Sequence, residues 1–81
     1  MKLATLDLHA VSVADVADRV DRFLVQQTSR SAARARIMTG KGTGAVQKTV
    51  IAYLKLGGYP WEFERMENGK RNEGVLVVIL E

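Results

Sequence analysis

A carboxylate and the only imidazole of the chain, those of Asp7 and His9, lie two positions apart near the start of the sequence. If this segment is extended, side chains at i and i+2 project from the same face, which places the two groups together. Histidine transfers protons near neutral pH without a large pKa shift, and a neighbouring carboxylate would orient the ring or hold a metal-bound water. The pair predicts acid or base chemistry at His9, with a purely structural, hydrogen-bonding histidine as the alternative.

A glycine-rich segment, Thr39-Gly40-Lys41-Gly42-Thr43-Gly44, lies between the apolar residues Ile37 and Met38 and a stretch with helical periodicity. Its three glycines let the backbone approach a ligand closely, and the start of the following helix adds N–H groups and a positive dipole end. This arrangement predicts a phosphate-binding loop. Within it, Lys41 would stabilise the charge of a phosphorane-like transition state.

The spacing of the glycines distinguishes between classes of phosphate ligand. A Walker loop needs four residues between its first glycine and a Gly-Lys pair, whereas Lys41 follows Gly40 directly. A dinucleotide fingerprint has the spacing Gly-x-Gly-x-x-Gly in the first strand-to-helix turn, whereas Gly40, Gly42 and Gly44 are evenly spaced in the second. We therefore favour the phosphate of a polynucleotide, and a tight turn without a ligand stays the alternative.

The charge of the chain is unevenly distributed, although its net value is only +3. No acidic residue lies between Arg22 and Trp61, and this basic block contains Arg22, Arg30, Arg34, Arg36, Lys41, Lys48 and Lys55. Such a block attracts polyanions in a salt-dependent way. Arg34 and Arg36 share one face of an expected strand and suit backbone phosphates, as does Lys48 in the helix after the loop. A solvated surface with scattered cations is the alternative.

Composition narrows the chemistry further. The 81 residues include no cysteine, which excludes disulfides, thiolate metal sites and cysteine nucleophiles, and a lone histidine does not build a zinc site. Two-metal phosphodiesterases cluster several carboxylates, whereas Asp7 is the only acid before the first expected helix. A carboxylate-rich metal nuclease is therefore disfavoured, and Mg²⁺ is left open as a cofactor without assigned ligands. The chain has neither a signal peptide nor an apolar run of membrane-spanning length, so we expect one cytoplasmic domain over residues 1–81, without a membrane partner.

Hydrophobic periodicity predicts six elements in the order βαβαββ. Strands are expected at 3–9, 34–39, 59–63 and 75–80, and helices from a Ser12 cap to Ser29 and from Gly44 to the Gly57-Gly58 pair. The segment Glu67-Asn68-Gly69-Lys70 predicts a hairpin. Because strand-helix-strand crossovers are right-handed, both helices should cover one face of a mixed four-stranded sheet.

Two features of these elements have alternative interpretations. The last strand is apolar on both sides, which indicates either a place at the centre of the sheet or a partner over its open face. Tyr59 and Trp61 are expected to pack around the Gly57-Gly58 turn, and stacking on exposed bases is the alternative.

Two short motifs and the last strand resemble those of the Smr (small MutS-related) domain family. Leu6-Asp7-Leu8-His9 belongs to the first strand, Thr39-Gly40-Lys41-Gly42 follows about thirty residues later, and the apolar run 74–80 ends the chain. The resemblance covers nearly all residues and implies a two-layer α/β sandwich that nicks DNA, cleaves RNA or binds nucleic acid. Such domains occur alone or at the C-terminus of MutS-type ATPases, and they are connected with DNA repair, recombination and ribosome quality control.

One position departs from the family pattern, because Ala10 stands where the family has glycine. Alanine adopts a positive φ less easily, so the turn after His9 is expected to differ. The resemblance implies that His9 transfers a proton, that Asp7 orients it, and that Lys41 and the loop amides hold the phosphate. The leading hypothesis is an endonuclease that acts on RNA or DNA. The alternative is a non-catalytic module that binds nucleic acid or the ribosome, including one cut from a larger MutS-type protein.

Overall fold

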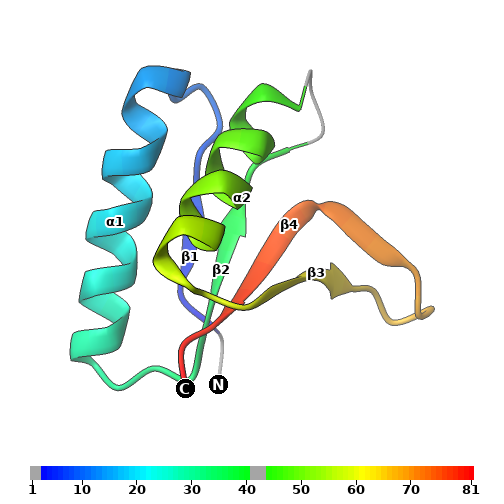
Figure 1. The fold of residues 1–81 in the computed structure, drawn as a ribbon. Coiled ribbons are helices and arrows are strands. Elements are labelled where there is room, and N and C mark those ends of the chain that lie inside the picture. Colours follow the sequence, from blue (N-terminus) through cyan, green and yellow to red (C-terminus); the bar gives the residue numbers. More distant parts are fainter. Residues whose placement is uncertain (1–2, 41–43) are drawn as a thin grey trace.

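The computed structural model describes residues 3–40 and 44–81 and contains six elements in the predicted order (Figure 1). They are β1 (Thr5–Asp7), α1 (Val13–Ser29), β2 (Arg34–Met38), α2 (Ala45–Gly57), β3 (Trp61–Arg65) and β4 (Arg71–Ile79). β1 is shorter than expected because a turn begins directly after it. β4 starts four residues earlier than expected, since Arg71 already pairs with Arg65 across the hairpin.

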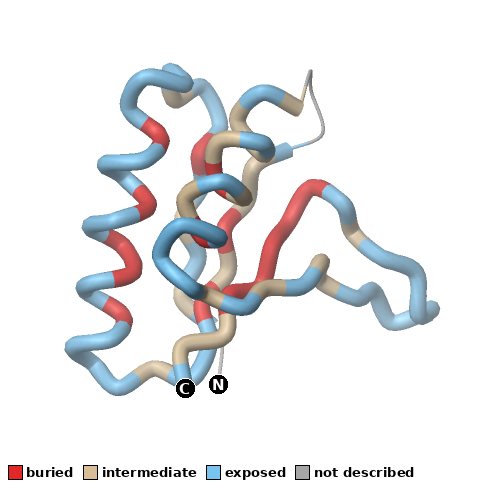
Figure 2. The backbone as a smooth tube through the Cα atoms, in the orientation of Figure 1, coloured by how far each residue is buried: buried red, intermediate tan, exposed pale blue. Residues whose placement is uncertain are grey.

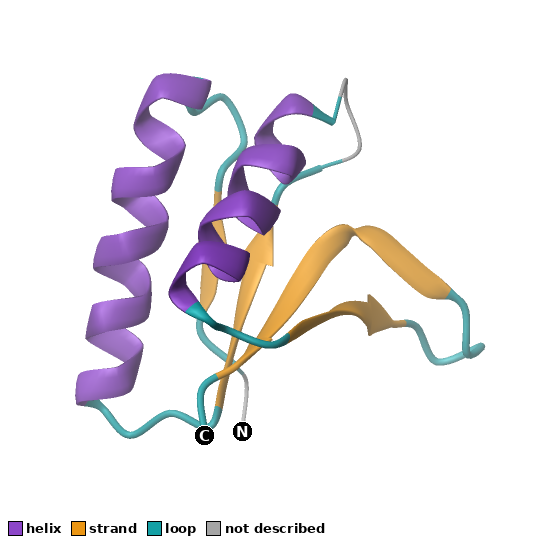
Figure 3. Cartoon of the chain, in the orientation of Figure 1, coloured by secondary structure: helices purple, strands orange, loops and turns teal. Residues whose placement is uncertain are grey.

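The four strands form one mixed sheet in the order β1-β2-β4-β3. β1 pairs with β2 in parallel, and β4 is antiparallel to both of its neighbours, β2 and β3. Both helices lie on one side of the sheet, and the outer half of the β3–β4 hairpin extends away from them (Figure 3). The predicted two-layer α/β fold is confirmed. The last strand lies between β2 and β3, which was one of the two interpretations of its apolar residues.

The open face of the sheet is partly covered by its own side chains. Val75 and Val77 of β4 are 3% and 7% exposed, although the alternation of the strand points them away from the core cluster. Arg36 lies opposite Val77 in the register, and its guanidinium reaches across β4 to Glu64 of β3, with an N–O distance of 2.7 Å. This ion pair lies over the central strand and explains how both faces of β4 are shielded from water.

The helix ends follow from local chemistry. The Oγ of Ser12 accepts a hydrogen bond of 3.3 Å from the Ala14 N–H and caps α1, as predicted. Gly58 ends α2 with a φ of 73°, in the left-handed conformation that glycine adopts at low cost. The ring of Tyr59 packs so closely on Gly57 that a Cβ there would lie 2.8 Å from it, so the expected packing of Tyr59 around this turn is confirmed.

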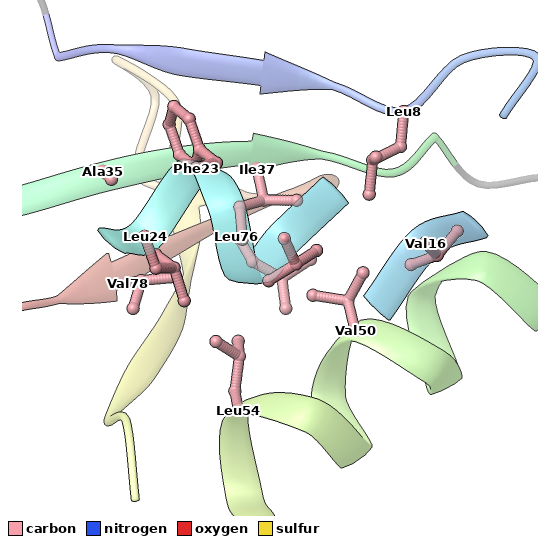
Figure 4. Packing of buried hydrophobic residues seen from close by; sticks show 11 residues of the cluster. Leu8, Val16, Phe23, Leu24, Ala35, Ile37, Val50, Leu54, Leu76 and Val78 are labelled. Carbon is pink, nitrogen blue, oxygen red and sulfur yellow. The ribbon is translucent and has the colours of Figure 1, made fainter. Parts of the chain in front are cut away.

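The core lies between the sheet and the two helices (Figure 4). Ile37 and Leu76 of the sheet face Val50 and Leu54 of α2, and all four side chains are fully buried. The buried stripe of α1 consists of Val16, Val20, Phe23, Leu24 and Gln27, whereas Val13 in its first turn is 46% exposed. Burial is concentrated in the middle of β4 and along one side of α1 (Figure 2).

Neither helix combines the length and the apolar character that crossing a membrane requires, among the residues that the structure describes.

The two helices are joined by a side-chain hydrogen bond in which the Tyr53 hydroxyl of α2 donates to Oδ1 of Asp21 on α1. This bond, together with partial burial and the negative charge of Asp21, raises the pKa of Tyr53 to about 12 from its ordinary value of 10.0. The neutral phenol is the donor, so the bond contributes fully to stability below pH 10. Its contribution is lost as the pH rises from 10 to 12.

We expect this bond to be visible in a pH titration of the Tyr59→Phe variant, in which Tyr53 is the only remaining tyrosine. The ultraviolet absorbance of tyrosinate should appear with a midpoint near pH 12, and Asp21→Asn in the same background should move the midpoint down towards 10. A midpoint that Asp21→Asn leaves unchanged would contradict the link between the helices.

Candidate functional site

The two motifs that carry the predicted chemistry meet at the carboxyl ends of β1 and β2. These strands are parallel, Asp7 lies opposite Met38, and the Leu8 N–H extends the ladder with a bond of 3.0 Å to the Met38 carbonyl. Paired strands are about 4.8 Å apart, so the turn at His9 and the start of the glycine loop are neighbours at one edge of the sheet. Ligands of open α/β sheets bind at this edge, beyond the carboxyl ends of parallel strands.

Asp7 holds the backbone of the turn that presents His9. Its Oδ1 accepts a hydrogen bond of 2.8 Å from the His9 backbone N–H, as in an Asx turn, and the side chains of both residues are exposed. A second bond, 3.1 Å from the Val11 N–H to the Leu8 carbonyl, closes the turn. Asp7 thus positions His9 through its backbone, and the imidazole lies at the surface.

Ala10 adopts a backbone conformation that glycine adopts at low cost. Its φ is 60°, in the left-handed region, in spite of its Cβ. An L-residue in this region costs about 1–2 kcal/mol, because its Cβ crowds the following carbonyl oxygen. Alanine therefore holds a positive φ in this turn with local strain, and the expected difference from the family's turn stays a prediction.

The start of the glycine loop is fixed to the central strand. The N–H groups of Thr39 and Gly40 both donate to the Gly74 carbonyl of β4, at 2.9 and 3.1 Å. The Thr39 hydroxyl donates to the Gly40 carbonyl at 3.0 Å and accepts from Nε2 of Gln47 at 3.3 Å. These bonds direct the hydroxyl of Thr39 towards the protein, so that it orders the loop.

Gln47 of α2 is a positioning residue that sequence reasoning missed. Its Nε2 donates both to Thr39 Oγ1 and to the Glu73 carbonyl, and so joins the loop, the helix and β4. Only the fold reveals this role, because a glutamine in the first turn of a helix is unremarkable in sequence.

The end of the loop leads into the N-terminus of α2. Gly44 precedes the helix with a φ of 82°, no acidic residue lies in the first turn, and Lys48 is exposed one turn further on. A helix N-terminus with a nearby cation favours an anion. Lys41, Gly42 and Thr43 lie outside the described residues, so their predicted contacts with phosphate stay predictions.

The two arginines assigned to phosphate from the sequence lie elsewhere. Arg36 is engaged by Glu64 and also donates to Thr5 Oγ1 at 3.1 Å, and its Nε is buried without a partner among the described residues. Arg34 is exposed at the start of β2, at the opposite end of that strand from the loop. The structure therefore brings His9, Thr39, Gly40, Gly44 and Lys48 to one end of the sheet, and leaves Arg34 and Arg36 apart from it.

Residues 3–40 and 44–81 contain no group of three or more His, Cys, Asp or Glu side chains arranged to hold a metal ion. Asp7 lies opposite Met38 in the strand register, and its Oδ1 already accepts a hydrogen bond.

We expect Ala10→Gly to raise the free energy of unfolding by about 0.5–1 kcal/mol, since it removes the strain of the left-handed conformation at some cost in chain entropy. Ala52→Gly, at an exposed position within α2, is the matched control and should lower the free energy of unfolding by about 1 kcal/mol. Urea unfolding measures both variants. If both substitutions changed the free energy of unfolding in the same direction, the proposed strain at Ala10 would be contradicted.

Replacing Gln47 by alanine should lower the free energy of unfolding by about 1–2 kcal/mol, since two hydrogen bonds are lost and one of their partners, the Thr39 hydroxyl, stays partly buried. Amide hydrogen exchange at Thr39 and Gly40 should accelerate at the same time. Gln26→Ala, at an exposed position of α1, should change neither quantity. Unchanged exchange at Thr39 in Gln47→Ala would show that the loop is held without this side chain.

A family model of the Smr domain matches residues 6–81. The protein named Endonuclease MutS2 from Lachnospira eligens is 33% identical over 73 residues, which are 90% of this chain and 9% of that protein. The crystal structure of the Smr domain of Thermus thermophilus MutS2 superposes with a TM-score of 0.82 at 28% identity, covering 98% of this chain and 99% of that one.

YdaL, a stand-alone small MutS-related protein from Escherichia coli, shares the fold with a TM-score of 0.81 at 20% identity, over 95% of this chain and 63% of YdaL. The chain spans only 9–10% of the length of the curated MutS2 relatives that it matches. The family match extends from the first strand to the end of the last one and includes both motifs of the site. The chain belongs to the Smr domain family.

Proposed function

We propose that this domain binds a polynucleotide at the glycine loop and cleaves a phosphodiester bond with the help of His9. The proposal rests on one observation above all, the parallel pairing of β1 with β2, which makes the His9 turn and the Thr39–Gly40 segment neighbours. The similarity to proteins named endonucleases supports it.

Each group has a defined part in the proposed reaction. Cleavage removes a proton from the attacking oxygen and delivers one to the leaving oxygen, and an exposed imidazole is suited to either step at neutral pH. Because His9 is the only histidine of the chain, water or Lys41 would carry the other proton. The N-terminus of α2, Lys48 and the loop amides would hold the phosphate.

The proposal extends to partners that the resemblance suggests. The nucleic acid is RNA or DNA, the ribosome is a further candidate partner, and a MutS-type ATPase in the same polypeptide is suggested by the relatives. Magnesium would be held by substrate phosphates together with Asp7, in the manner of a hard cation that keeps most of its waters.

The proposal is tested by cleavage of labelled single- and double-stranded RNA and DNA by the wild-type chain and by His9→Ala, each with magnesium or with a chelator. We expect His9→Ala to lose at least about 100-fold in rate, the usual contribution of a general acid or base. Its affinity for the substrate should change less than twofold. Lys55→Ala, which removes a charge at the far end of α2, is the control and should cleave like the wild type.

The outcomes separate the two candidate functions. Cleavage that survives in His9→Ala would contradict the role of the imidazole. If neither protein cleaves but both bind, and Lys41→Ala weakens binding, the domain is a binding module without nuclease activity. Cleavage in the presence of chelator would show that magnesium is not required.

A further inference from the structure

A row of arginines follows α1 beside the edge strand β1. Arg19, Arg22 and Arg30 are spaced along the helix so that they lie on one side of it, and Arg34 continues the row at the start of β2. Two neighbouring hollows, of about 450 and 510 Å³, are lined by these side chains and by residues of the β1 segment. We call this surface the arginine furrow and define it by the four arginines.

The cations of the furrow are largely free to bind a ligand. Arg22 forms one exposed ion pair with Asp18, at 3.3 Å, with 78% and 65% of the two side chains exposed. Such a pair is worth less than about 1 kcal/mol, so a phosphate displaces it easily. Within the described residues, Arg19, Arg30 and Arg34 have no ion-pair partner at all.

The furrow also contains apolar and hydrogen-bonding groups beneath its charges. Leu6 and Phe23 line one hollow, and Leu3, which is 40% exposed, lines the other. Gln27 lines this second hollow and is 5% exposed. Its side-chain amide carries both hydrogen-bond donors and an acceptor.

We propose that the arginine furrow binds single-stranded polynucleotide adjoining the phosphodiester at the candidate site, an inference that rests on the proposed function. The arginines match the phosphates, the apolar groups match the faces of unpaired bases, and the Gln27 amide matches a base edge. In a duplex the base faces are stacked on one another, so only its phosphates could contact the arginines of the furrow.

The furrow has the length and direction that this binding requires. α1 begins three residues after Ala10, next to the turn that presents His9, and runs along the sandwich (Figure 1). Its 17 residues span about 25 Å at 1.5 Å per residue, room for several nucleotides. A single-stranded polynucleotide bound at the loop would therefore extend along α1 towards Arg30 and Arg34.

The test uses two double variants, Arg19→Gln with Arg22→Gln and Arg30→Gln with Arg34→Gln. The matched control, Lys55→Gln with Arg65→Gln, removes the same charge outside the furrow. Fluorescence anisotropy with labelled single-stranded RNA and DNA of twelve nucleotides gives the affinity at several salt concentrations. The affinity of each furrow variant should fall roughly 10- to 30-fold at 0.1 M salt. Because two phosphate contacts are lost, the slope of log K against log salt should become less steep by about 1.4. The control should lose less than threefold.

The results separate the furrow from the proposed function. Equal losses in the control and furrow variants would overturn the furrow, while cleavage that depends on His9 would still stand. Equal losses for a twelve-base-pair duplex and a single strand would overturn the single-strand assignment. A wild-type chain that binds no oligonucleotide would overturn both the furrow and the proposed function. A loss confined to RNA or to DNA would support the furrow and identify its ligand.

Discussion

The central position of β4 is the constraint on which the rest of the structure depends. Its residues from Gly74 to Val78 are buried, and they pair with β2 on one side and β3 on the other. The Gly74 carbonyl accepts both the Thr39 and the Gly40 N–H, so the strand that organises the core also fixes the start of the loop. The site is therefore complete only when β4 has folded, although its residues precede β4 in the sequence, between His9 and Lys48.

Around this strand, the polar side chains have different tasks. Asp7 binds the backbone of the His9 turn, Thr39 binds the backbone of the loop, and Gln47 joins Thr39 Oγ1 to the Glu73 carbonyl. The side chains of His9 and Lys48 are exposed to solvent. Each such bond contributes about 1 kcal/mol, and a small domain is stable by only about 5–10 kcal/mol, so a few bonds decide whether the turns are ordered. The ion pair of Arg36 belongs to this supporting set, because it shields the valines of β4.

Much of the fold could be predicted from local sequence, and the limits of the prediction have physical causes. Alternation, the Ser12 cap and the Gly57-Gly58 stop identify the elements, and parallel pairing places His9 beside the loop. The contact of Arg36 with Glu64 could not be predicted, since it depends on β4 lying between their strands and on a register shift between Phe63 and Glu64. Gln47 was missed for the same reason, because its partners lie 8 and 26 residues away.

The basic block illustrates how charge along a sequence differs from charge in space. The fold uses Arg36 internally, brings Lys48 to the loop, and joins Arg30 and Arg34 to Arg19, which lies outside the block. Arg30 lies at the opposite end of α1 from the His9 turn, about 25 Å away, and Arg34 lies at the opposite end of β2 from the loop. The Debye length at physiological salt is about 8 Å. On the proposed function, screening would confine these two arginines to an effect on how tightly a polynucleotide is held, without an effect on the proton transfers proposed for His9.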